Sequence, residues 1–291
     1  MGATVYVITG ATGSLGRLAV EALLERVPAA EVRATGRRVD TLDDLAARGV
    51  DVRRADYDDP ASLAAALDGA TRVLFVSGSD AGARLDQHRR VVEALAAAGV
   101  ELVGYTSILH AQTSDMLLAT EHAATERMLA DAGVPHVLLR NGWYTENFLA
   151  SLAADVEHGI VGASGDGRFD AATRADYAEA AVVALTGGAA PGDVLELGGP
   201  GFTRAELAAE IGRAAGREVP YTDLSVDGFR EALVGAGLPE AFAAVLADSD
   251  RGAAAGWLTA PGDDLARLLG RPATPWTEVV DAAVRDVVTP V

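Results

Sequence analysis

Short apolar runs alternate with amphipathic stretches through the first half of the chain. The runs that predict strands are Thr4–Ile8, Glu31–Thr35, Asp51–Ala55, Thr71–Val76, Glu101–Thr106 and His136–Arg140. Between them, Leu15–Arg26 and Arg84–Ala98 carry apolar residues at three- and four-residue spacing, which is typical of helices that cover a sheet. This alternation predicts an α/β fold, with a doubly wound parallel sheet of the Rossmann type.

The pattern changes in the last third of the chain. A further apolar run, Val194–Leu197, predicts one more strand of the same sheet. Beyond it the sequence is mostly helical, with a capping-box pattern at Thr203 and Glu206 and a short predicted strand at Glu218–Thr222. We therefore predict two domains: a Rossmann domain over 1–150, to which 171–198 returns, and a smaller substrate-side domain over 151–170 and 199–291.

A glycine-rich segment directly follows the first predicted strand and opens the first predicted helix. Gly10 allows a tight turn, Gly13 lets the backbone approach a pyrophosphate, and Gly16 lets the helix pack close to the strand. Amide groups at the helix N-terminus then face the phosphates. The segment predicts a dinucleotide site, and the competing interpretation is a glycine-rich turn without a ligand. The predicted cradle comprises Gly10, Thr12, Gly13, Ser14, Leu15 and Gly16.

The tip of the second predicted strand indicates which dinucleotide binds. A carboxylate at this point would bind the ribose 2′-hydroxyl of NAD, but here Arg37 and Arg38 follow the strand. Two guanidinium groups suit a 2′-phosphate, so we predict NADP(H), with a preference of at least about tenfold. The alternative is a solvated pair that balances Asp40, Asp43 and Asp44.

The next two strands end in further candidate cofactor contacts. Asp56 is predicted either to accept a hydrogen bond from the adenine amino group or to close its own turn. The fourth strand is followed by a polar turn at the edge of the sheet where ligands of open α/β folds bind. This turn, Ser77, Gly78 and Ser79, is predicted to line the inner ribose, unless it is an ordinary polar turn.

Polar and aromatic residues follow the fifth and sixth predicted strands, in Tyr105–His110 and Arg140–Phe148. A flat substrate stacked over a nicotinamide needs such a wall. Trp143 and Tyr144 are equally compatible with that wall and with core packing, whereas Phe148 favours the core. The candidate substrate contacts are His110, Trp143, Tyr144 and Phe148.

Composition and charge narrow the classes of function. Among the 291 residues there is no cysteine and no lysine, which excludes disulfides, thiolate chemistry and lysine-based catalysis. The net charge of −18 argues against nucleic acid and membrane surfaces as partners. We expect no metal, since no histidine and acidic cluster has ligand spacing. Neither a transmembrane run nor a signal peptide is expected, so the predicted compartment is the cytoplasm. Monomer and homodimer both remain open.

The chain resembles the NmrA-like, atypical short-chain dehydrogenase/reductase group, and within it the type 2 NAD(P)H:quinone oxidoreductases. Triphenylmethane-dye reductases are related. The resemblance implies a Rossmann domain with a small C-terminal domain, NADPH binding, and flavin-independent two-electron reduction of quinones or similar planar acceptors. The segments that carry it are Thr9–Gly16, Val52–Tyr57, Tyr105–His110, Thr125–Leu129, Leu139–Asn147, Gly165–Gly167, Ala172–Tyr177, Leu246–Asp250 and Leu269–Pro272.

The resemblance also implies roles for particular residues. The segment Asn141–Glu146 is expected to border the nicotinamide, Arg37 to face the 2′-phosphate, and Ala172–Arg174 to help close the site. The cofactor contacts expected at this end are Thr106, Asn141, Gly142, Trp143, Tyr144 and Arg174. The candidate catalytic residues are Asn141, Tyr144 and His122.

One departure from the group leaves alternatives open. Related plant reductases use a lysine near the position of His122, and this chain has none. His122 is either a substitute proton donor or a helix-surface histidine. The alternatives to a quinone reductase are an NADP(H)-binding sensor without turnover, and a reductase dedicated to a biosynthetic intermediate.

Overall fold

A computed structural model of the chain describes residues 4–78, 80 and 82–288. Its centre is a parallel sheet of seven strands in the order β3-β2-β1-β4-β5-β6-β9. The order reverses between β1 and β4, which creates the crevice where open α/β folds bind ligands. The α/β, doubly wound prediction is confirmed. The strands are β1 (Tyr6–Ile8), β2 (Val32–Gly36), β3 (Asp51–Arg54), β4 (Arg72–Phe75), β5 (Leu102–Ile108), β6 (His136–Asn141) and β9 (Val194–Leu197).

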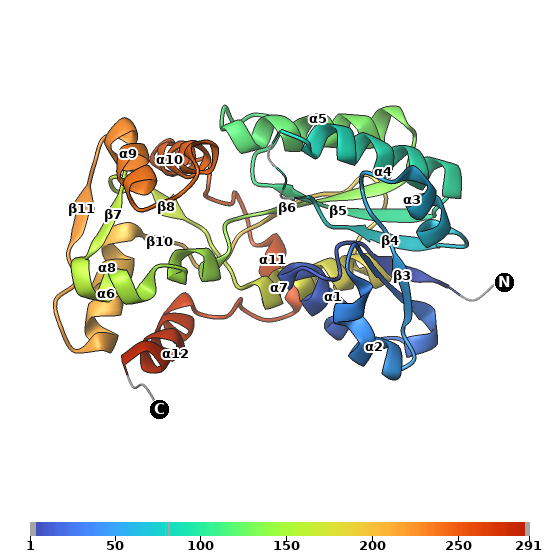
Figure 1. Cartoon of the computed structure of the whole chain (residues 1–291), viewed down its shortest axis with the longest axis horizontal. Helices are drawn as coiled ribbons and strands as arrows, with labels where there is room; N and C mark the ends of the chain where they lie inside the picture. The colour runs from blue at the N-terminus through green and yellow to red at the C-terminus, as the bar shows by residue number, and fades with distance from the viewer. Residues whose placement is uncertain (1–3, 79, 81, 289–291) are drawn as a thin grey trace.

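Helices cover both faces of this sheet (Figure 1). One face carries α1 (Ser14–Leu24), α2 (Asp43–Ala47) and α7 (Arg174–Val183), and the other carries α3 (Pro60–Leu67), α4 (Arg84–Ala98) and α5 (Leu117–Asp131). Each of these helices except α2, which buries only Leu45, buries an apolar stripe against the sheet, such as Val91, Val92 and Leu95 of α4. The sheet is thus held between two apolar cores, and the loops that follow the strands converge at its carboxyl edge.

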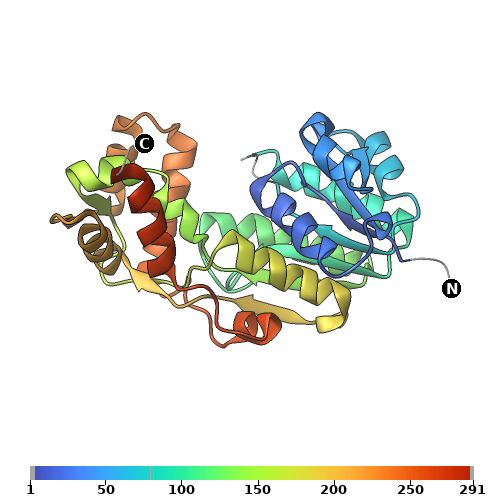
Figure 2. The ribbon, with the colours of Figure 1, turned by 90° about the horizontal axis from the view of Figure 1, so that it is seen from below.

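The smaller part of the molecule lies beyond the carboxyl ends of the strands (Figure 2). It has two small sheets, β8 (Arg168–Phe169) with β10 (Phe202–Thr203) and β7 (Ile160–Gly162) with β11 (Tyr221–Asp223). The helices of this part are α6 (Leu152–His158), α8 (Arg204–Ala215), α9 (Val226–Gly235), α10 (Glu240–Ala254) and α12 (Trp276–Val288). Its core is aromatic, with Phe148 packed edge-on against Phe169 and Phe202. The predicted capping box at the start of α8 is confirmed.

Two details differ from the sequence-based predictions. The strand expected at Glu218–Thr222 is β11, which begins three residues later and ends one residue later, because Val219 packs against α8 at Gly212 before the chain pairs with β7. The last third is also not wholly separate, because α11 (Asp264–Leu269) packs against α7 and β9 of the large sheet. We therefore propose the predicted two-domain division with α11 assigned to the Rossmann domain.

Short helical turns complete the chain: η1 (Ala29–Glu31), η2 (Val39–Leu42), η3 (Thr145–Leu149) and η4 (Ala184–Gly188). Within residues 4–78, 80 and 82–288, no helix combines the length and apolar character needed to cross a bilayer.

Candidate active site

The glycine-rich segment forms a tight turn between β1 and α1. Gly10 has a φ of +61°, which glycine adopts without strain. A Cβ on Gly16 would lie 2.3 Å from the carbonyl oxygen of Gly10, so only glycine lets the helix start this close to the strand. Gly13 is the N-cap and offers no side chain to the first turn of α1, which carries no acidic residue. The amide groups of this helix start are therefore available to an anion.

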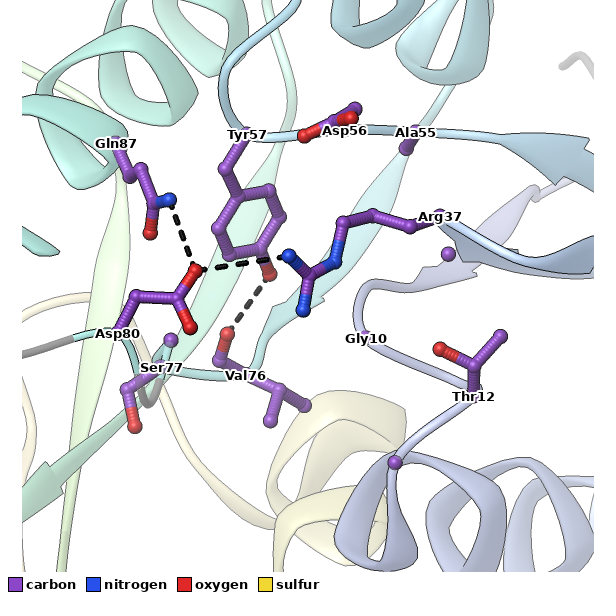
Figure 3. Close-up of a pocket in the computed structure, with 13 residues that line it drawn as sticks. Gly10, Thr12, Arg37, Ala55, Asp56, Tyr57, Val76, Ser77, Asp80 and Gln87 are labelled. Carbon is purple, nitrogen blue, oxygen red and sulfur yellow. Dashed lines mark hydrogen bonds and ion pairs between the residues drawn. The ribbon is translucent and has the colours of Figure 1, made fainter. Parts of the chain in front are cut away.

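A cavity of about 190 Å³ opens over this turn, at the carboxyl ends of β1, β2 and β4 (Figure 3). Of the predicted cofactor contacts, the cavity is lined by Gly10, Thr12, Gly13, Arg37, Asp56, Ser77 and Gly78. The other lining residues were not predicted as contacts: Gly36, Ala55, Tyr57, Val76, Asp80 and Gln87. Ser79 lies outside the described residues.

The remaining predicted contacts near this cavity do not line it. Leu15 and Gly16 are buried behind the turn, and Ser14 is exposed. Arg38 is exposed beside Arg37, and its carbonyl oxygen accepts a hydrogen bond from Thr41. Thr106 is buried, and its hydroxyl accepts the backbone N–H of Ser77 at 2.9 Å. Thr106 thus holds the lining residue in place from behind.

Tyr57 forms one wall of the cavity. Its hydroxyl donates to the carbonyl oxygen of Val76 at 2.8 Å and lies 2.6 Å from the Thr9 hydroxyl. Burial raises the pKa of Tyr57, so the phenol stays neutral. These bonds fasten the turn after β3 to the end of β4. In the sequence, Tyr57 is the only aromatic residue of an acidic turn, which is a weak signal for such a role.

Asp56 closes its own turn and also borders the cavity. Its carboxylate accepts the backbone N–H of Asp58 at 3.1 Å and pairs with Arg54 at 3.2 Å. The N-cap of α3 is Asp59. The turn interpretation of Asp56 is therefore confirmed, while its contact to adenine stays a prediction.

Two side chains of α4 hold the loop that follows β4. Arg84 Nε donates to the carbonyl oxygen of Gly78 at 2.7 Å, and the N–H of Gly78 donates to His88 Nε2 at 2.9 Å. Because Nε2 accepts, the proton of the neutral imidazole lies on Nδ1, which faces the Thr125 hydroxyl at 2.8 Å. Burial, together with the nearby Arg84, lowers the pKa of His88 to about 3.

This arrangement predicts a loss of stability in acid. The folded-state pKa of His88 lies below its unfolded value of about 6.5, so its contribution is complete above pH 6.5 and is lost as the pH falls toward 3. We expect the free energy of unfolding to fall by up to about 1.4 kcal/mol per pH unit in this window from His88 alone. Urea unfolding at several pH values gives the free energy of unfolding of wild type and of His88→Gln, which keeps an acceptor for the Gly78 N–H. This free energy should depend more steeply on pH in wild type. The same pH dependence in both proteins would contradict the prediction. His122 is present in both, so its titration does not contribute to the difference.

The other candidate site residues lie at the end of β6, in the segment Asn141–Tyr144, and none of them lines the cavity. Asn141 is 4% exposed, and its Oδ1 atom is buried without a hydrogen-bond partner among the described residues. A Cβ on Gly142 would lie 2.4 Å from the Asp170 carbonyl oxygen, so the segment runs tightly along the chain that returns from the small domain. Tyr144 pairs there with Ala172. An unpaired buried acceptor is costly, which marks Asn141 as a candidate ligand contact.

Tyr144 is enclosed by side chains of the neighbouring segment. Its ring lies edge-on to Tyr177 at 5.5 Å between centroids, and the Arg174 guanidinium carbon is 5.0 Å from its centre. Burial raises the pKa of the Tyr144 phenol. Trp143 and Phe148 both pack into the core of the small domain, Trp143 being only half-buried. The core interpretation of Phe148 is therefore confirmed, and we no longer place it at the substrate.

The two candidate histidines lie in different surroundings. His122 is 6% exposed, and its Nδ1 lies 2.9 Å from the Tyr105 hydroxyl, so the helix-surface interpretation is wrong. Burial lowers its pKa well below 6.5, so the ring is neutral at neutral pH and lacks the imidazolium proton that the predicted proton donor would need. His110 stands at the end of β5 with a φ of +55°. Its Nε2 lies 2.8 Å from the Thr259 carbonyl oxygen, and its ring lies edge-on to Trp257.

Within the described residues, no three side chains of histidine, aspartate or glutamate gather as a metal site would require.

Comparisons with known proteins find relatives that match most of the chain. A family model described as NAD(P)H-binding matches residues 10–187. Quinone oxidoreductase 2 of Escherichia coli (strain K12) is 48% identical over 275 residues, covering 94% of this chain and 96% of that protein. The crystal structure of an E. coli NADPH-dependent quinone oxidoreductase with NADPH is similar at a TM-score of 0.92 and 46% identity, over 95% of this chain and 99% of that one.

Citrobacter sp. triphenylmethane reductase complexed with NADP(H) is similar at a TM-score of 0.90 and 36% identity, over 96% of this chain and 99% of that one. The family resemblance predicted from the sequence is thereby confirmed. Since the family model spans more than half of the chain and the E. coli relative nearly all of it, the chain belongs to the NAD(P)H-binding, NmrA-like family.

Proposed function

We propose that this protein is an NADPH-dependent reductase of quinones or similar planar, electron-poor acceptors. The observation that carries the proposal is the Gly10–Gly16 cradle at the carboxyl end of β1, together with an Asn141 Oδ1 at the carboxyl end of β6 that has no hydrogen-bond partner among the described residues. The similarity to a quinone oxidoreductase over 94% of the chain supports the choice of acceptor.

The residues present fit a dinucleotide. The uncapped start of α1 suits a pyrophosphate, and Arg37 suits a 2′-phosphate, because both offer hydrogen bonds with positive character. Asn141 Oδ1 suits an amide donor such as the carboxamide of the nicotinamide, which would pair an otherwise orphaned acceptor. Gly142, Trp143, Tyr144 and Arg174 are proposed to border the same end of the cofactor.

When bound, NADPH supplies a hydride to the acceptor. We assign Asn141 to orienting the nicotinamide ring and Tyr144 to one wall of the acceptor pocket, with His110 and Trp143 as further acceptor contacts. Burial raises the pKa of the Tyr144 phenol, so its Oη atom stays protonated and is able to donate a hydrogen bond to the acceptor oxygen. Arg174 and Tyr177 flank the half-buried ring of Tyr144. His122 has no role in this proposal.

The test is oxidation of NADPH followed at 340 nm with benzoquinones, naphthoquinones and a triphenylmethane dye, and with NADH in parallel. We expect turnover with at least one acceptor, faster at low cofactor concentration with NADPH than with NADH, because Arg37 pairs with the 2′-phosphate. No turnover with NADPH still bound in calorimetry would overturn the quinone assignment and favour a sensor or a reductase with a dedicated substrate. No binding of either cofactor would overturn the proposal altogether.

A further inference from the structure

Arg37 has an acidic partner inside the cavity. Its guanidinium lies 3.6 Å from a carboxylate oxygen of Asp80, and both residues line the cavity from opposite sides (Figure 3). Arg37 follows β2 and Asp80 belongs to the loop after β4, so the pair links two separate segments that line the cavity. The Arg37 guanidinium, which we assign to the 2′-phosphate of the cofactor, is thus already paired with a carboxylate of the protein.

The carboxylate of Asp80 is held in place from behind. Gln87 on α4 is 4% exposed, and its amide nitrogen donates to Asp80 at 3.1 Å and to Asp58 at 2.9 Å. Both backbone groups of Gly78, two residues earlier, are bound by Arg84 and His88. An exposed ion pair alone is worth little, since both side chains must be ordered to form it. Here the buried amide of Gln87 orders the carboxylate in advance.

The pairing of Arg37 with Asp80 affects the binding of NADPH and of NADH differently. A 2′-phosphate carries between one and two negative charges, and near Arg37 it meets the charge of Asp80. A ribose 2′-hydroxyl carries no charge and meets no such repulsion. We propose that Asp80 is a built-in competitor for the 2′-phosphate, and that it sets how strongly the protein prefers NADPH over NADH. The inference rests on the proposed function, and it adds a specificity-determining residue to it.

The test is Asp80→Asn, which keeps the size of the side chain and removes its charge. At low ionic strength we expect the Kd of NADPH to fall about threefold to tenfold, while that of NADH changes less than about twofold. The NADPH effect should shrink as salt is added, because the charges are partly exposed. Calorimetry and nicotinamide fluorescence give both constants. Asp86→Asn is the matched control: its carboxylate pairs with Arg89 on the exposed side of α4, so neither Kd should change.

A double-mutant cycle with Arg37→Gln separates this inference from the proposed function. If Asp80 acts through Arg37, Asp80→Asn should change the affinity for NADPH differently when Arg37 is absent. If wild type binds both cofactors and Asp80→Asn leaves their ratio unchanged, or shifts both constants equally, the inference is overturned and the proposed function stands. If Asp80→Asn weakens NADPH binding, Asp80 is a cofactor contact and not a competitor. If wild type binds neither cofactor, both are overturned.

Discussion

Replacement of Gly16 with alanine is expected to abolish NADPH binding and to lower the free energy of unfolding by about 3 kcal/mol. The added Cβ would lie 2.3 Å from the Gly10 carbonyl oxygen, 2.7 Å from the Gly10 carbonyl carbon and 2.9 Å from the Ala11 Cα. All three are backbone atoms, so no flexible side chain is able to yield. Either α1 moves away from β1 or the turn at Gly10 opens, and both changes move the amide groups that we assign to the pyrophosphate.

Urea unfolding and calorimetric titration with NADPH measure the two effects of Gly16→Ala separately. Gly235→Ala provides a matched control, because Gly235 ends α9 and its Cβ would meet no heavy atom within 4 Å. That variant should bind NADPH as wild type does and should be unchanged or slightly more stable, by up to about 1 kcal/mol. NADPH affinity in Gly16→Ala equal to that of wild type would refute the assignment of this turn to the cofactor.

The second large effect is expected at Asn141. Asn141→Leu should lower kcat with a quinone acceptor by about 100-fold while the Kd of NADPH changes only a few-fold. Loss of the Oδ1 acceptor frees the nicotinamide ring, and a misplacement of about 1 Å is enough for a loss of that size. The substitution leaves Arg37 and the Gly10–Gly16 turn unchanged. We expect their contacts to the phosphates and the adenosine to dominate the affinity for NADPH.

Stability provides an independent readout for Asn141→Leu. Its buried Oδ1 has no partner among the residues that the structure describes, so removal of that acceptor relieves a desolvation cost of about 1–3 kcal/mol. We expect unfolding by urea to require at least as much free energy as in wild type, although turnover is lost. Gly235→Ala is again the control, because Gly235 ends α9 and its Cβ would meet no heavy atom within 4 Å. Loss of stability in Asn141→Leu, or turnover equal to that of wild type, would contradict the assigned role.

Local periodicity was sufficient for most of the Rossmann domain. Strand-length apolar runs and helical spacing predicted all seven strands of the large sheet and their parallel, doubly wound arrangement, because each element buries one face and right-handed crossovers leave few arrangements. The glycine turn was also readable in advance, since glycine is required wherever backbone approaches backbone, as Gly16 approaches Gly10. The two arginines after β2 could be identified because a strand tip has a fixed place in this fold.

Which side chains from distant segments meet around the cavity was decided only by the tertiary structure. Tyr57, Asp80 and Gln87 come from three separate segments, and no spacing in the sequence shows that they converge on one cavity. His122 has the helix position of a surface residue beside Glu121, yet the packing of α5 buries it against Tyr105. Periodicity reports which face of an element is buried, but contacts between distant segments depend on how the crossovers and loops position those faces. The sequence therefore determined the sheet and the turn that suits a pyrophosphate, while the packing of separate segments decided which charges surround Arg37.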